Sequence, residues 1–163
     1  MSQALNTAPF KRRGRVLVEA DAVALYSRAT VLDGFPGEYP PDDTGSSGLA
    51  VAKAAVERGF VSAYNHAFGL DHALAALVLS PVIVGTNWYE SMFTPDASGF
   101  VRPSGAIAGG HEYALIGLDP VKSRVTAINS WGPGWGNQGR FFLSFADLGR
   151  LLDESGDVVV PVQ

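Results

Sequence analysis

Residues 109–142 constrain the fold of this chain more than any other stretch. They begin with Gly-Gly-His-Glu-Tyr-Ala-Leu-Ile-Gly-Leu-Asp and end with Ile-Asn-Ser-Trp-Gly-Pro-Gly-Trp-Gly-Asn-Gln-Gly-Arg-Phe-Phe. The apolar runs in and after this stretch predict three strands, at residues 111–118, 124–130 and 140–145. The link between the first two strands is of hairpin length. His111 therefore opens one strand, and Asn129 lies at the end of the next.

Two helices are predicted before this region. Ser46 or Ser47 caps the first, which ends at Gly59 and whose inner face is formed by Leu49, Ala52, Ala55 and Val56. Asp71 caps the second, which runs to residue 79.

The remaining elements complete an α+β pattern. A buried strand is predicted at 81–88, a short helix at 145–152 and a last strand at 158–160. Loops are predicted at 33–48, 60–70 and 95–110, and the pattern at 15–24 fits a short strand or a helical turn equally well. Because helices precede antiparallel strands, we expect an N-terminal helical part packed on a C-terminal antiparallel sheet or half-barrel.

The composition is that of one globular domain. Hydrophobic residues make up 47% of the 163 residues and charged residues 17%, a balance that favours a packed core over disorder. The chain contains no repeat or linker, so we expect a single domain over residues 15–163, preceded by a flexible arm over residues 1–14.

Charge and cysteine content exclude several classes of function. The net charge of -4 argues against nucleic acid as the main partner, and we interpret the basic cluster at 11–15 as a solvated part of the arm. The sequence has no apolar run near the roughly 20 residues of a membrane span and no secretory signal. We therefore expect a soluble protein of unassigned compartment. The absence of cysteine excludes disulfides, cysteine-bound metals and thiol chemistry, and no cofactor or metal site is predicted.

The residues around His111 suit a hydrolytic site. A histidine can take the proton of a nucleophile, and an amide side chain such as that of Asn129 can fix the imidazole ring. Trp131 follows Asn129 by two residues and can shield the pair from water. The ring would project from the sheet edge into a cleft that binds a peptide or protein ligand, with candidate binding residues Gly109, Gly110, Trp88 and Trp131.

These motifs resemble those of the papain-like family of cysteine peptidases. The resemblance is carried by Gly-Gly-His-x-x-x-Leu-Ile-Gly-x-Asp and by the longer Asn-Ser-Trp-Gly-x-x-Trp-Gly-x-x-Gly-x-Phe, and it covers residues from about 41 to 145. It implies a papain-like fold in a short member of the bacterial or phage type, with His111 and Asn129 as catalytic partners. It also implies a cysteine at the amino end of a helix, where the dipole and the N–H groups stabilise a thiolate.

The chain departs from the family at that nucleophile. The family's helix opens with Gln-Gly-Ser-Cys-Gly-Ser-Cys-Trp-Ala-Phe, and an alignment without gaps places residues 44–53 beneath it. Thr44 then falls on the oxyanion glutamine, Ser47 on a disulfide cysteine and Ala50 on the nucleophile. A methyl group cannot attack a carbonyl carbon. The resemblance therefore implies a catalytically inactive homologue that serves as a peptide-binding or structural module.

Three alternatives stay open at the level of sequence. A shift of three residues puts Ser47 at the nucleophile position, which would give an active peptidase or amidase, although a hydroxyl needs a better organised base than a thiol does. A natural cysteine replaced by Ala50 in this chain would restore the family's chemistry. An apolar-rich domain with a basic arm also suits a structural component of a viral or envelope assembly, homomeric or heteromeric.

Overall fold

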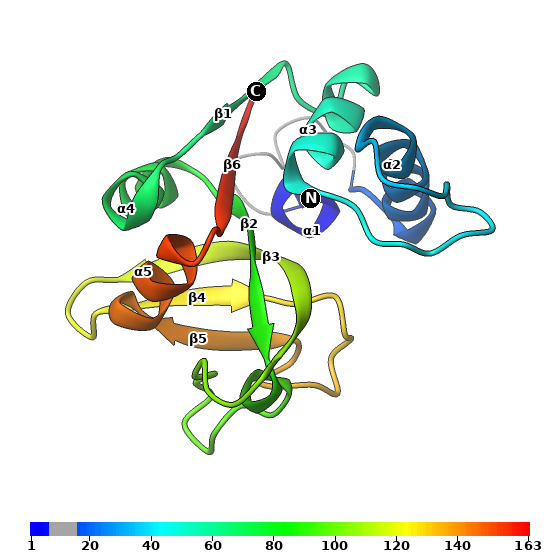
Figure 1. The fold of residues 1–163 in the computed structure, drawn as a ribbon. Coiled ribbons are helices and arrows are strands. Elements are labelled where there is room, and N and C mark those ends of the chain that lie inside the picture. The colour runs from blue at the N-terminus through cyan, green and yellow to red at the C-terminus, as the bar shows by residue number, and fades with distance from the viewer. Residues whose placement is uncertain (7–15) are drawn as a thin grey trace.

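The computed structural model describes residues 1–6 and 16–163, and its framework is a six-stranded sheet (Figure 1). The strands lie in the spatial order β1-β6-β2-β3-β4-β5, and every neighbouring pair is antiparallel. Their bounds are Ala63–His66 (β1), Val82–Tyr89 (β2), Ile107–Asp119 (β3), Arg124–Ile128 (β4), Arg140–Ser144 (β5) and Asp157–Val162 (β6). The predicted antiparallel sheet is confirmed, and β3 and β4 form the expected hairpin.

Helices cover both faces of the sheet. Their bounds are Ser2–Leu5 (α1), Glu19–Leu32 (α2), Gly48–Glu57 (α3), Gly69–Leu79 (α4), Phe145–Asp153 (α5) and, for one 3-10 helix, Glu90–Phe93 (η2). Alternate residues of β2 face opposite layers. Val82 and Val84 pack with α4 and α5, whereas Ile83 packs with α1 and α3. The α+β class is confirmed. In the described ranges, no helix is long and apolar enough to cross a membrane.

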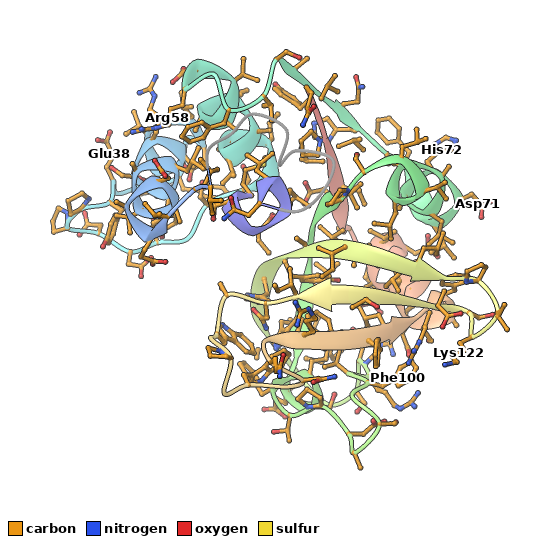
Figure 2. The ribbon with its side chains drawn as sticks, turned by 180° about the vertical axis from the view of Figure 1, so that it is seen from behind. Glu38, Arg58, Asp71, His72, Phe100 and Lys122 are labelled. Atoms are coloured by element: carbon orange, nitrogen blue, oxygen red, sulfur yellow. The ribbon has the colours of Figure 1, made fainter. Side chains whose placement is uncertain are left out.

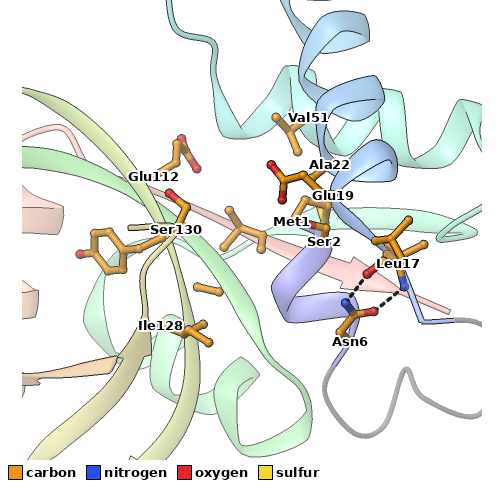
Figure 3. A pocket seen from close by; sticks show the side chains of 14 residues that line it. Met1, Ser2, Asn6, Leu17, Glu19, Ala22, Val51, Glu112, Ile128 and Ser130 are labelled. Carbon is orange, nitrogen blue, oxygen red and sulfur yellow. Dashed lines mark hydrogen bonds between the residues drawn. The ribbon is translucent and has the colours of Figure 1, made fainter. Parts of the chain in front are cut away.

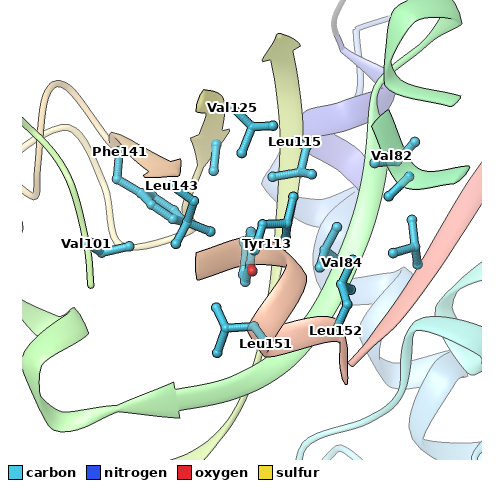
Figure 4. Close-up of a cluster of buried hydrophobic side chains, with 14 of the residues drawn as sticks. Val82, Val84, Val101, Tyr113, Leu115, Val125, Phe141, Leu143, Leu151 and Leu152 are labelled. Atoms are coloured by element: carbon cyan, nitrogen blue, oxygen red, sulfur yellow. The ribbon is translucent and has the colours of Figure 1, made fainter. Parts of the chain in front are cut away.

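The larger core lies between β2–β5 and the helices α4 and α5 (Figure 4). Its largest fully buried side chains include Leu115 of β3, Phe141 of β5 and Leu151 of α5, each at most 1% exposed. Burying one side chain of this size contributes roughly 1.5–3 kcal/mol. This core therefore holds β3, the strand that carries His111, in a fixed position.

Helix α3 begins where the sequence predicts a cap. The Oγ of Ser47 accepts the backbone N–H of Ala50 at 3.3 Å, and the helix ends at Glu57, just before Gly59 with its positive φ of 67°. Its packed face consists of Ala52, Ala54 and Ala55, all fully buried. Leu49 was expected on that face but is 37% exposed, because the helical turn places it largely on the side opposite Ala50, Ala54 and Ala55.

Helix α4 begins earlier than predicted. Its N-cap is Phe68, and Gly69 turns the chain into the helix with a φ of 73°. The prediction that Asp71 caps this helix is therefore wrong. Asp71 lies in the first turn, where its carboxylate still favours the positive end of the helix. His72 is exposed on the outer side of α4 (Figure 2).

Three elements differ from the predictions at the amino-terminal end and the central link. Helix α2 replaces the short strand or helical turn expected at 15–24 and extends into the predicted loop at 33–48 only as far as its C-cap, Asp33. Strand β1 lies in the link expected at 60–70. Residues 2–5 were expected in a loose arm but form α1, whose Ala4 and Leu5 are buried. The expected arm boundary at residue 14 and the basic cluster at 11–15 lie outside the described residues, which resume at residue 16.

Candidate active site

His111 and Asn129 form the hydrogen bond that the sequence suggests. The Nε2 atom of His111 lies 2.9 Å from Oδ1 of Asn129, and the same oxygen accepts the backbone N–H of Ser130 at 2.8 Å. An amide oxygen only accepts hydrogen bonds, so Nε2 carries the proton and Nδ1 is the basic nitrogen of the neutral ring. Asn129 is 2% exposed, so this orientation is protected from competing water.

Aromatic rings surround the His111 ring. The centroid of Trp131 lies 4.8 Å from it, and that of Trp88 lies 4.7 Å from it in an edge-on arrangement. Trp131 is partly exposed and stacks on Phe93, whereas Trp88 is only 2% exposed. The structure thus places Trp131 over the site as expected. Trp88 belongs to the core beneath the ring, so it supports His111 and does not offer a surface to a ligand.

This environment sets the protonation of His111. Burial lowers the pKa of its imidazole, and the hydrogen bond to Asn129 opposes that change in part. The ring is therefore neutral at pH 7, with Nδ1 able to accept a proton. His111 thus has the properties of a general base.

A cavity of about 840 Å³ opens beside His111. Thr44, Ser47, Gly110 and His111 all line it, so the structure brings these four predicted residues to one cleft. Gly110 has open space around the position of a Cβ atom, as does Gly109. Among the described residues, no hydrogen bond joins Ser47 to His111.

Ala50 lies elsewhere. It is 1% exposed in the first turn of α3, and among the described residues that line the cleft, Val51 is present but Ala50 is not. Ser47 stands at the amino end of the helix, which is where a nucleophile would gain from the helix dipole. The cleft therefore presents a hydroxyl at this end of α3 and not the methyl group of residue 50.

Helix α2 fixes the loop that forms the opposite wall of the cleft. The hydroxyl of Tyr26 is hydrogen-bonded to the carboxylate of Asp43 and accepts the backbone N–H of Gly45 at 3.0 Å. Gly45 has a φ of 80°, which a glycine adopts without strain. Thr44 is thereby held between two anchored residues, exposed at the rim of the cleft.

Two acidic residues that the sequence did not single out also line the cleft. Glu112 of β3 and Asp157 of β6 both pair in register with Gly85, on opposite sides of β2. A Cβ atom on Gly85 would lie 2.4 Å from Oε1 of Glu112 and 2.4 Å from Oδ1 of Asp157. The two carboxyl groups therefore converge over this glycine. The separation of Oε1 of Glu112 from Oδ1 of Asp157 is at most the sum of these two distances.

The pKa values of both carboxyl groups reflect this placement. Burial, followed by the charge of Asp157, raises the pKa of Glu112 from 4.5 to about 7, while the α-amino group of Met1 and the backbone N–H of Gly48 act in the opposite direction. Burial also raises the pKa of Asp157, and His66 opposes this. A glycine inside an apolar strand was the one sequence signal of such a close approach.

The site offers acid–base groups without a metal centre in the described ranges. No group of three or more histidine, aspartate or glutamate side chains there could hold a metal ion. The arrangement thus combines an oriented base at His111, a hydroxyl at Ser47 and a carboxyl pair at Glu112 and Asp157, all facing one cavity.

Comparison with known proteins adds evidence on the fold. No family model and no curated protein sequence matches the chain. Among solved structures, xylellain, a cysteine protease from Xylella fastidiosa, superposes with a TM-score of 0.70 at 18% identity, over 99% of this chain and 78% of that one. The cysteine protease CMS1MS2 of Carica candamarcensis gives 0.64 at 13% identity over 92% and 79%, and the bromelain protease of Ananas comosus gives 0.63 at 13% over 98% and 84%. These neighbours are papain-like cysteine proteases, and the chain therefore has the papain-like fold.

Proposed function

We propose that this protein is a papain-like domain without cysteine peptidase activity, and that its cleft binds a peptide or protein segment. The cavity of about 840 Å³ beside His111 carries the proposal. Its volume lies in the range of roughly 300–1,000 Å³ typical of ligand sites. The chain holds no cysteine, so the thiolate mechanism has no nucleophile.

The amino end of α3 gives further support. In a cysteine peptidase, this end of the helix stabilises a thiolate. Here the backbone N–H of Gly48 faces the carboxyl group of Glu112, and a Cβ atom on Gly48 would lie 2.8 Å from Oδ2 of Asp157. The chain's own acidic side chains therefore occupy the place where an anionic nucleophile would be stabilised. Acidic groups at this end of the helix suit binding better than acyl transfer.

The test is a peptide-binding experiment with a blocked cleft. Peptides selected from a displayed random library on the purified protein would be measured by calorimetry. Gly110→Trp should weaken binding about tenfold or more, since this loses at least ~1.4 kcal/mol and the new ring enters the cleft. Gly109→Trp is the matched control. It has similar open space but does not line the cleft among the described residues. Failure to select any peptide, or equal binding by both variants, would refute the proposal.

A second candidate is a serine hydrolase that uses Ser47. The observation in its favour is that Ser47 caps α3 and lines the same cavity as His111, whose ring is oriented by Asn129. Labelling of Ser47 by a fluorophosphonate probe, lost in His111→Ala, would establish it. Absence of labelling in the natural sequence would leave binding as the function.

Introduced thiols separate the two nucleophile positions. Ser47→Cys places a thiol in the cleft, whereas Ala50→Cys places it in the buried part of α3. We expect Ser47→Cys to react with a thiol-reactive inhibitor such as E-64, which is bound in the Carica and Ananas structures. Ala50→Cys should react slowly or not at all. Faster reaction at position 50 would instead support a natural cysteine at that position.

A further inference from the structure

The contact between the amino end of α3 and the sheet contains two carboxyl groups and little else that is polar. The carboxyl groups of Glu112 and Asp157 lie over Gly85 of β2 and beneath Gly48 of α3. A Cβ atom on Gly48 would lie 2.8 Å from Oδ2 of Asp157 and 3.3 Å from both oxygens of Glu112. Only glycine fits at both positions without displacing an oxygen. The two carboxyl groups therefore lie between α3 and the sheet, in close contact with both.

Charged and titratable groups approach the pair from several elements. His66 of β1 acts on Asp157, and the α-amino group of Met1 acts on Glu112. Tyr113 and His111 flank Glu112 on β3. Glu19 of α2 lines a smaller cavity of about 380 Å³ with Glu112 (Figure 3). Among the described residues, neither carboxyl group of the pair forms a salt bridge. The Met1 amino group favours the charged form of Glu112, while burial lowers the pKa of that amino group itself.

Two partly buried carboxyl groups so close together cannot both ionise without cost, so this placement favours the protonated form of Glu112. The elevated pKa of Glu112, about 7, agrees with this arrangement. Loss of this proton adds a negative charge to the contact between α3 and the sheet.

The rest of the α3 contact is thin. Ala52 packs against Ile83, Ala114 and Val159 of the sheet in a small cluster. Alanine side chains bury little area, so at roughly 25 cal/mol per Å² this contact with the sheet contributes little, whereas Ala54 and Ala55 pack with Leu25 of α2 in a second cluster. The amino end of α3 also opens onto the cleft, because Ser46, Ser47, Glu112 and Asp157 all line it. Water can therefore reach any carboxylate that turns away from the contact.

We propose that Glu112 and Asp157 form a proton-controlled latch between α3 and the sheet. With Glu112 protonated, the pair keeps the amino end of α3 on β2 and β6. When that proton is lost, the two carboxylates turn apart into the cleft, and the amino end of α3 moves away with the loop that precedes it. The cleft is wider in the deprotonated state. The effect on a bound peptide rests on the function proposed above, but the movement itself does not.

The absence of cysteine makes the movement directly measurable. Leu49→Cys at the amino end of α3 and Lys122→Cys in the β3–β4 turn are both exposed and can carry spin labels without background. Pulsed EPR would compare the label distances at pH 5.5 and pH 8.5. We expect a change of about 1–2 Å in the mean distance, the scale of helix shifts at packed interfaces, with a broader distribution at pH 8.5.

Variants identify the groups responsible. In Glu112→Gln and in Asp157→Asn, the distance should no longer depend on pH. Glu38→Gln removes the same charge from an exposed loop and should keep the full change. Equal distances at both pH values in the natural pair, or an undiminished change in Glu112→Gln and Asp157→Asn, would overturn the latch. No ligand is present in this experiment. Its failure would therefore leave peptide binding untouched, and a failure to bind peptides would leave the latch untouched.

Discussion

Glu112→Gln should stabilise the protein at pH 8 but not at pH 5. The reasoning starts from the proton that the folded state retains. Because the pKa of Glu112 is raised from 4.5 to about 7, the folded chain keeps this proton between those values while the unfolded chain has lost it. The free energy of unfolding therefore falls as the pH rises from about 4.5 to about 7, and stays low above that range.

The size of the effect follows from the same values. A change of one in pKa corresponds to roughly 1.4 kcal/mol, so the rise at Glu112 corresponds to about 3 kcal/mol. The cleft admits water to the pair, which makes this an upper limit. Glutamine keeps the shape of the side chain and carries no charge. We therefore expect Glu112→Gln to raise the free energy of unfolding by roughly 2–3 kcal/mol at pH 8, and by less than about 1 kcal/mol at pH 5.

The assay is urea unfolding followed by the fluorescence of the three tryptophans. The quantity to compare is the difference between Glu112→Gln and the natural sequence at each pH, since carboxyl groups remote from the pair titrate alike in both proteins. Glu38→Gln, on an exposed loop, controls for the change in net charge. The same difference at pH 5 and pH 8, or a destabilisation at pH 8, would refute the reasoning.

Three further predictions concern the site and its supports. The NMR titration midpoint of His111 should lie below 6.5, and Asn129→Ala should lower it further, since their hydrogen bond favours the charged ring; a midpoint unchanged by the substitution would contradict this. Gly85→Ala should cost roughly 1–3 kcal/mol in urea unfolding, because its Cβ would meet two carboxyl oxygens at 2.4 Å; native stability would show that the acids can move aside freely. Ser47→Ala should cost about 1 kcal/mol through the lost cap, and the uncharged cap in Ser47→Asn should recover it; equal losses would mean that the cap contributes little.

The sheet was predictable because its signals are local. The strands of the hairpin alternate or run apolar over several residues, and the turn between them has hairpin length. Helix α2 was missed because its buried residues are a mixed set, in which Asp21 and Thr30 stand with Leu25 and Ala29. Such a set gives no clear apolar period. Strand β1 was missed because it is a short, mostly exposed edge.

The candidate site also contains residues that the sequence could predict and residues that it could not. His111 and Asn129 could be predicted because both lie on one hairpin, where sequence distance and spatial distance agree. The meeting of Glu112 with Asp157 depends on the order in which β6, β2 and β3 assemble, which no local pattern records. The alignment places Ala50 at the nucleophile position, whereas the structure buries it in the first turn of α3. An alignment without gaps carries no information on where the helix begins, whereas the cap at Ser47 does.

His111 and the carboxyl pair of Glu112 and Asp157 favour a hydrolytic mechanism at opposite ends of the pH range. His111 can accept a proton through Nδ1 once its ring is neutral, a condition that its lowered pKa satisfies at pH 7 and above. Near the same pH, Glu112 loses its proton beside Asp157 at the amino end of α3. A second negative charge beside them, on Ser47, is then most strongly disfavoured. The conditions that make the base competent are thus those that make the hydroxyl hardest to ionise. On this reasoning, removing the acids in Glu112→Gln with Asp157→Asn should increase any fluorophosphonate labelling of Ser47.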